Sequence, residues 1–169
     1  MRAARMLREG GIILARTEKE KIEVADFGLG DLESFGLEIV TYVNTERCCA
    51  KELVLFPFQI CPEHAHPNIE DRLGKEETFR CRKGLVYLYV SGPRTEKPHA
   101  RIPDAKRNCF NAWHEIPLKP GEQYTLPPNT LHWFQAGKAG AIVSEFSTKS
   151  VDEKDIFTDP EIKRATVIV

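Results

Sequence analysis

Residues 64–76 read HAHPNIEDRLGKE, and Glu77 follows directly. Side chains two positions apart on a β-strand point to the same face, so His64 and His66 project together into the space that their strand faces. This geometry suits two ligands of one metal ion. A pair of solvent-exposed histidines on an edge strand is the alternative, and an HxH pair without further context favours it.

Two other stretches supply that context. In ETFRCRKG (77–84), Glu77 begins an alternating strand that ends at the turn residue Gly84. In PGEQYTLPPNTLHWFQAG (120–137), turn residues surround a short strand, and His132 begins the next one. Imidazoles and a carboxylate suit Mn, Fe, Co, Ni or Zn rather than Ca. The sequence therefore predicts a metal centre formed by His64, His66, Glu77 and His132.

The composition is that of one ordinary soluble domain. The chain has 169 residues with 24 basic and 25 acidic side chains, and its net charge of −1 draws it to neither nucleic acid nor an anionic membrane. Its first residues contain no apolar run long enough for a signal peptide or a membrane span. The five cysteines form no CxxC pair, which argues against a disulfide framework. We expect a single domain over 1–169 with reduced thiols, in the cytoplasm, without nucleic-acid or membrane partners.

Short strands dominate the sequence pattern. Residues 92–106 read as a loop, a short helix over 1–7 ends at a pair of glycines, and the tail 147–164 either stays solvated or folds back over the rest of the domain. Many short strands without a central helix predict an all-β sandwich or barrel of antiparallel sheets. The runs rich in Val, Ile, Phe, Tyr and Thr are IEVADFGL (22–29), LEIVTYVN (37–44), ELVLFPFQ (52–59), LVYLYVSG (85–92), GEQYTLP (121–127) and AIVSEFST (141–148).

The spacing of the candidate ligands resembles the two motifs of the cupins. The first cupin motif runs HxH, a few residues, Glu, six residues and Gly. The second runs Gly, five residues, Pro, any residue, Gly, two residues and His. The matching positions here are His64, His66, Glu77 and Gly84, then Gly121, Pro127 and His132. The resemblance implies an all-β cupin fold, a double-stranded β-helix or jelly-roll barrel, with a short N-terminal helix and a C-terminal tail.

Three positions depart from the cupin motifs. The gap between His66 and Glu77 contains the long insertion PNIEDRLGKE (67–76), Asn129 stands where the second motif has glycine, and Ala136 stands where asparagine is frequent. Asparagine is the commonest non-glycine residue at positive φ, so Asn129 can serve the same turn. The insertion brings polar side chains to the mouth of the barrel, beside the predicted metal.

Longer stretches resemble the D-lyxose isomerase family of small bacterial cupins. The similarity spans residues 26–164 and is most specific in CPEHAHP (61–67) and GKEETFRC (74–81). It implies a small-molecule monosaccharide substrate, with interconversion of D-lyxose and D-xylulose, and of D-mannose and D-fructose. It implies Mn²⁺ as the usual metal, although other divalent transition metals fit the same donors.

Isomerisation of an aldose requires two catalytic functions. A divalent ion that binds the carbonyl oxygen and the neighbouring hydroxyl polarises them and leads to a cis-enediolate, and a second group must carry a proton between C1 and C2. We expect Glu145 to be this general base, because it interrupts an apolar strand; the alternative is that it points to solvent. Lys75 is the candidate for stabilising the oxyanion or returning a proton, and an exposed loop lysine is its alternative.

Further residues are candidates for binding the sugar, each with a structural alternative. Glu76 is either a loop charge or a partner of a ligand histidine. Acidic and basic side chains of the tail can bind sugar hydroxyls if the tail closes over the mouth, and are otherwise solvated. The aromatic next to His132 can face a sugar but is more often core. The set is Glu76, Trp133, Asp155, Asp159 and Arg164.

Other functions and the assembly remain open at this point. A cupin with this ligand set can also be an Fe(II)-dependent dioxygenase, or a non-catalytic protein that binds sugar or metal. The polar group Lys75, Glu76 and Glu145 favours a sugar site, and no appended DNA-binding or effector segment is visible. We expect a homodimer, since cupins often pair strands across a dimer. The run at 37–44 either provides such a strand or lies inside the sheet.

Overall fold

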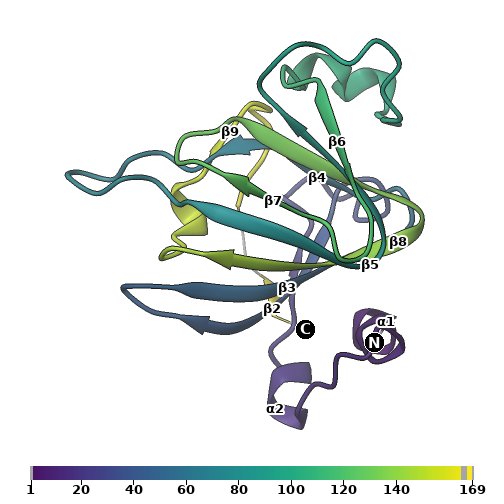
Figure 1. Ribbon diagram of the computed structural model, residues 1–169, viewed down its shortest axis with the longest axis vertical. Coiled ribbons are helices and arrows are strands. Elements are labelled where there is room, and N and C mark those ends of the chain that lie inside the picture. The colour runs from purple at the N-terminus through teal and green to yellow at the C-terminus, as the bar shows by residue number, and fades with distance from the viewer. Residues whose placement is uncertain (1, 165–166, 169) are drawn as a thin grey trace.

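The computed structural model describes residues 2–164 and 167–168, which form a curled antiparallel sheet with short helices at its margins (Figure 1). The helical segments are α1 (Arg2–Glu9), α2 (Arg16–Lys19) and the 3₁₀ helices η1 (Asp104–Cys109) and η2 (Asp152–Lys154). The strands are β1 (Glu23–Ala25), β2 (Leu37–Asn44), β3 (Cys49–Leu55), β4 (Ile60–Ala65), β5 (Glu77–Val90), β6 (His114–Leu118), β7 (Gln123–Leu126), β8 (His132–Ser147), β9 (Ile156–Phe157) and β10 (Val167–Ile168). The all-β prediction is confirmed.

The two longest strands, β5 and β8, connect most of the sheet. β8 pairs with β3, β4 and β5, and β5 pairs in addition with β6 and β7. Both strands bend where Gly84 meets Gly140, and both glycines have positive φ, at 80° and 75°. A Cβ atom on Gly84 would lie 2.0 Å from the carbonyl oxygen of Gly140, so no larger residue fits at this crossing. The bend curls the sheet into a half-barrel with a defined interior.

Apolar side chains fill the interior of the half-barrel and two outer layers. The interior includes Leu53, Phe79, Leu88 and Phe134. One outer layer lies under the N-terminal segment, where Leu7 of α1 belongs to the same cluster as Val40, Val54 and Ile142 of the sheet. The predicted helix at 1–7 is therefore present as α1, although Met1 lies outside the described residues. No helix in the described part of the chain has the length and apolar character needed to cross a bilayer.

The tail crosses the open side of the half-barrel. Of the two alternatives predicted for it, solvated or folded back over the domain, the structure has the second. The two-residue strand β9 pairs with β4, with Phe157 opposite His64. The hydroxyl of Thr158 donates to the carboxylate of Glu63 at 2.8 Å. Further on, the backbone N–H of Lys163 donates to the carbonyl oxygen of Phe27 at 2.9 Å. The tail therefore runs beside β4, the strand that carries His64.

The strand predicted at 37–44 lies inside the sheet. β2 pairs with β1 on one side through residues 37–39 and with β3 on the other. Among the described residues the pairing with β1 ends at residue 39, and Tyr42 and Val43 are exposed beyond it. The first half of this strand therefore lies between two other strands, as the alternative to a dimer strand predicted.

Glu38 on β2 gives a testable consequence of burial. Its side chain is 3% exposed, and neither carboxylate oxygen has a hydrogen-bond partner among the described residues. Burial raises the pKa of Glu38 to about 7, and the nearby Gln59 amide and Arg2 guanidinium offset only part of this effect. Because the folded-state pKa lies above that of the unfolded chain, the native state is penalised progressively as the pH rises from about 4.5 through 7.

We therefore expect E38Q to be more stable than the unmodified chain by about 3 kcal/mol at pH 8. At pH 4 the two proteins should have nearly equal free energies of unfolding, because the carboxyl group is then protonated in both states. Urea unfolding at the two pH values measures the difference. Equal free energies of unfolding for E38Q and the unmodified chain at pH 8 would show that ionisation of Glu38 does not destabilise the native state.

Candidate metal centre

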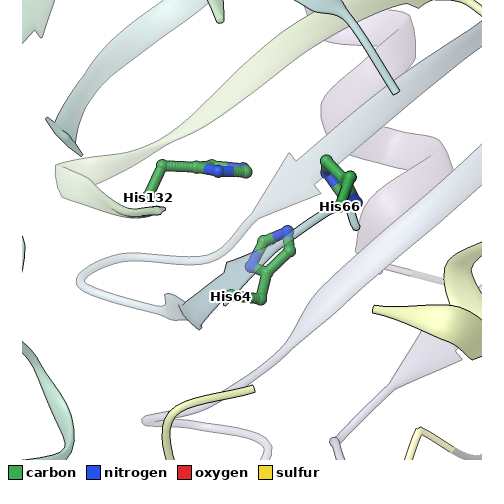
Figure 2. Close-up of side chains that lie close together, drawn as sticks. All are labelled: His64, His66 and His132. Atoms are coloured by element: carbon green, nitrogen blue, oxygen red, sulfur yellow. The ribbon is translucent and has the colours of Figure 1, made fainter. Parts of the chain in front are cut away.

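Three imidazole rings converge at the open end of the half-barrel (Figure 2). His64 lies on β4 and is the cross-strand partner of His132 at the start of β8. His66 follows two residues after His64, and the two rings have centroids 4.9 Å apart, as the HxH spacing predicts. The ligand nitrogens of the three histidines all lie within 4.8 Å of one another, and all three side chains are buried. The residues thus have the spacing that three ligands of one ion require.

Hydrogen bonds fix which ring nitrogen of each histidine faces the centre. Nδ1 of His64 lies 2.7 Å from the carbonyl oxygen of Pro62, and Nδ1 of His132 lies 2.8 Å from that of Thr130. A carbonyl oxygen accepts only, so in both rings Nδ1 carries a hydrogen and Nε2 is the nitrogen that faces the cluster. Nε2 of His132 is buried without a hydrogen-bond partner in the described structure. A buried ring nitrogen that faces two other imidazoles fits a metal ligand.

Glu77 adds the carboxylate at the same place. Its Oε1 atom lies 3.0 Å from Nε2 of His66 and 3.0 Å from Nε2 of His132. Burial opposes ionisation of this side chain, but the Lys75 ammonium and the two imidazoles outweigh it and hold the pKa of Glu77 well below its usual range. Burial, together with His132 and His66, holds the pKa of His64 well below its usual range, so this ring is neutral. The set of nitrogen and oxygen donors fits a divalent transition metal.

Lys75 and Glu145 meet beside the ligand cluster. Lys75 is 8% exposed and Glu145 is 4% exposed. The alternative left open by the sequence, that these side chains point to solvent, is therefore excluded for both. The Lys75 ammonium lies 2.7 Å from Oε2 of Glu77 and 3.0 Å from Oε1 of Glu145. Burial favours the neutral amine, yet Glu145 and Glu77 raise the pKa of Lys75 well above its usual range. The cavity therefore contains a permanent cation and a carboxylate in contact.

A second buried lysine, Lys51, was missed by the sequence analysis. It lies on β3, is 4% exposed, and its ammonium lies 2.7 Å from Asp152 and 2.9 Å from the hydroxyl of Ser150, both in the tail. It also approaches Glu145, at 4.0 Å. The signal that identified Glu145, a charged residue among apolar strand neighbours, is also present in CAKELVL at 49–55.

The cavity at this end of the barrel has a volume of about 40 Å³ and two kinds of wall. The polar wall is formed by the histidines at 64 and 66 together with Lys51, Lys75, Glu77, Glu145, Asp152, Asp155 and Arg164. The apolar wall is formed by Phe27, Leu37, Ile39, Leu53, Phe79, Phe134 and Phe157, with Cys61. Such a cavity offers hydrogen bonds on one side and van der Waals contact on the other, as a small polyhydroxylated molecule requires.

Two of the candidate sugar-binding residues line this cavity, and both already have ionic partners. A carboxylate oxygen of Asp155 lies 2.6 Å from Nδ1 of His66, on the ring side away from the cluster. The guanidinium of Arg164 lies 2.6 Å from Glu23 and 3.6 Å from Asp152. Asp155 thus orients a candidate ligand directly, which is the arrangement that strengthens metal binding by histidine.

The other three candidates lie away from the cavity. Glu76 is exposed at the surface, with its backbone bonded to Thr148. Asp159 is buried against Lys106, at 2.6 Å. Trp133 is 0% exposed, stacks on Tyr89 with ring centroids 3.9 Å apart, and donates its indole N–H to the backbone. Trp133 is therefore a core aromatic, which is the alternative to sugar binding that the sequence left open.

Comparison with known proteins connects this site to a sequence family. A sequence profile described as D-lyxose isomerase matches residues 16–169. A D-lyxose ketol-isomerase of Thermofilum sp. is 67% identical over 168 residues, covering 99% of this chain and 93% of that protein. A D-lyxose/D-mannose isomerase of Thermosediminibacter oceani is 65% identical, covering 94% of this chain and 87% of that protein. A D-lyxose ketol-isomerase of Cohnella laeviribosi is 58% identical, with coverage of 99% and 92%.

Solved structures agree on the fold. The ligand-free L-ribose isomerase of Cellulomonas parahominis superposes with a TM-score of 0.76, covering 99% of this chain and 92% of that chain, at 13% identity. The L-ribose isomerase of Acinetobacter sp. DL28 in complex with L-ribose has a TM-score of 0.75 at 14% identity, covering 95% of this chain and 90% of that chain. At this level of identity the likeness concerns the barrel architecture alone.

Proposed function

The chain belongs to the D-lyxose isomerase family, and on that premise we propose that it interconverts D-lyxose and D-xylulose, and also D-mannose and D-fructose, with a bound divalent transition metal. The general reaction is that of an aldose–ketose isomerase. We propose Mn²⁺ as the native metal and His64, His66, Glu77 and His132 as its ligands. When bound there, such an ion supplies Lewis-acid polarisation of the sugar carbonyl.

The single observation that supports this reaction is the contact between Lys75 and Glu145 beside the imidazole cluster. Isomerisation moves a proton between C1 and C2. Of the cavity carboxylates that are not bonded to a candidate ligand histidine, Glu145 contacts Lys75 beside the cluster, whereas Asp152 is bonded to Lys51. Glu145 takes the proton from C2 of the aldose and returns it to C1, while the hydroxyl proton of O2 passes to O1. Lys75, which stays protonated, donates a hydrogen bond to the oxygen on which negative charge develops.

The remaining polar side chains hold the sugar in position. The ammonium of Lys51 and the guanidinium of Arg164 line the cavity at the side of the tail, where they can donate to hydroxyl oxygens distant from C1 and C2. Asp155 keeps the His66 ring in one orientation. The apolar wall excludes water from the reacting carbons, which strengthens the hydrogen bonds of Lys75.

A substrate panel tests the proposed function. The purified protein is stripped of metal with a chelator, reloaded with Mn²⁺, and incubated with D-lyxose, D-mannose and other aldoses while ketose formation is followed. We expect ketose from lyxose and mannose with the Mn²⁺ form and none with the stripped form. Oxygen uptake by an Fe(II)-loaded sample would favour a dioxygenase, and sugar binding without product would favour a non-catalytic protein.

The assembly and the compartment belong to the same proposal. We propose a homodimer formed on the outer face of the sheet, where Val43, Ala50 and Phe146 lie side by side across β2, β3 and β8 and where Val43 and Phe146 are exposed. The mass of the protein in solution, measured by light scattering, tests this assembly. All five cysteines are free thiols, which supports a cytoplasmic location.

A further inference from the structure

Two departures from the cupin motifs meet in space. Asn68 lies in the insertion after His66, and Asn129 stands at the glycine position of the second motif, with φ of 61°. The two residues bond each other reciprocally, once through the backbone of Asn68 and once between the side chains. The backbone N–H of Asn68 donates to Oδ1 of Asn129 at 3.2 Å, and Nδ2 of Asn129 donates to Oδ1 of Asn68 at 2.8 Å. We call these two residues the amide clamp.

The amide clamp closes the insertion into a loop whose two ends meet at His66. Oδ1 of Asn68 also accepts the backbone N–H of Gly74 at 2.9 Å, and the backbone N–H of Asn129 donates to the carbonyl oxygen of His66 at 3.2 Å. A Cβ atom on Gly74 would lie 2.1 Å from that same carbonyl oxygen, so the chain passes His66 as closely as a glycine allows. The loop therefore begins and ends on the backbone of a candidate metal ligand.

Few other contacts hold this loop: an exposed ion pair joins Arg72 to Glu46 at 3.4 Å, and the backbone of Glu76 bonds Thr148 after Lys75. Residues 70–73 are exposed, and Leu73 is among the exposed large apolar side chains. The loop's own backbone bonds join Ile69 and Arg72 to each other rather than to the barrel. The residue that follows Gly74 is Lys75, which is buried between Glu77 and Glu145. The position of the backbone at Gly74 therefore determines the position of the Lys75 ammonium.

We propose that Asn68 and Asn129 are positioning residues that hold the insertion against the second motif and thereby set the place of Lys75. Both asparagines are exposed and lie outside the cavity, so they act through Lys75 rather than on the sugar. The consequence for catalysis rests on the proposed function. The competing explanation is that Asn129 merely tolerates the turn, in which case glycine, which the cupin motif has there, would serve equally well.

The variant Asn129→Gly separates these explanations, because it keeps the turn free of strain and removes only the amide. We expect N129G to lower kcat for D-lyxose about tenfold, with KM and the affinity for Mn²⁺ within about threefold of the unmodified chain. N68A should have a similar effect, because it also removes the bond from Nδ2 of Asn129 to Oδ1 of Asn68. Because the two single variants share the loss of this bond, the double variant should lose less activity than the product of the two single effects. N129D, which keeps the acceptor for the Asn68 N–H, should lie between N129G and the unmodified chain. N108A, an exposed asparagine on η1, is the control.

Hydrogen exchange provides a readout that does not depend on the reaction. The Gly74 amide bonds to Asn68, so its exchange should be at least about tenfold faster in N129G and N68A. If the unmodified chain does not isomerise D-lyxose, the proposed function fails while this measurement still tests the clamp. Unchanged exchange at Gly74, an N129G variant with unchanged kcat, or single effects that multiply in the double variant would each overturn the inference.

Discussion

The variant His132→Ala is expected to lose isomerase activity by about 10³-fold or more and to bind Mn²⁺ at least about 100-fold more weakly. His132 provides a buried Nε2 atom without a hydrogen-bond partner in the described structure, and this atom lies 3.0 Å from Glu77. Alanine removes the nitrogen and leaves the carboxylate without one of its two imidazole neighbours. Activity with D-lyxose and a direct titration of the stripped protein with Mn²⁺ measure the two effects separately.

A matched histidine variant shows whether the loss is specific. His114 lies on β6, outside the cavity, and its Nδ1 atom contacts the backbone of Pro93. H114A should bind Mn²⁺ and turn over the sugar as the unmodified chain does. A His132→Ala protein that folds, as judged by its circular dichroism, and retains full activity would remove this residue from the metal centre and with it the main premise of the proposed mechanism.

The convergence of the three histidines and Glu77 could be predicted from the sequence because two of its geometric requirements are local. An HxH pair on one strand shares a face whatever the rest of the fold does, and the turn before His132 is marked by Pro127 and Asn129. What the sequence could not supply was the register of β4 against β8, which sets His64 opposite His132. In the sequence analysis, the resemblance to the cupin motifs was the basis for placing His132 beside His64.

Trp133 and Glu145 illustrate where strand periodicity fails. The two residues are an even number of positions apart on β8, and strict alternation would place both on the same face. Between them the ladder with β5 shifts register, so that Ala136 pairs with Val86 whereas Ala141 pairs with Gly84. Alternation is reversed across this bulge, so Phe134 and Val143 both face the interior. Trp133 packs in the second outer layer, against the rings of Tyr89, Phe110 and Trp113. The bulge has no signal in the sequence beyond its glycines.

Lys51 and the tail show a different limit. A lysine in CAKELVL could have been recognised as unusual, but its partners Ser150 and Asp152 lie about 100 positions further along the chain. The tail is polar, and polar terminal segments are usually solvated. It is placed here by ionic contacts with residues of the barrel, for example between Arg164 and Glu23. Pairings of this kind depend on three-dimensional distance alone, which periodicity does not report.

The variant Glu145→Gln is expected to lower kcat by about 10²–10⁴-fold while Mn²⁺ affinity stays within about threefold. Glutamine has nearly the same shape, and its amide oxygen can still accept the hydrogen bond from Lys75, but it cannot take up a proton at neutral pH. The described side-chain contacts of Glu145 are with Lys51, Lys75 and Ser147, so the histidine cluster should remain intact. The rate of ketose formation and a titration with Mn²⁺ measure the two quantities.

Isotope exchange decides whether the loss reflects proton transfer. In D₂O the unmodified chain should incorporate deuterium at C1 of the ketose, because a proton carried by Glu145 exchanges with solvent, whereas E145Q should form product too slowly for incorporation to be seen. E96Q, on an exposed loop, is the control and should behave as the unmodified chain. Rapid turnover without any deuterium would mean that hydrogen passes directly between the carbons. Glu145 would then have a role in binding the sugar, and the cavity would have to perform the isomerisation without a proton carrier.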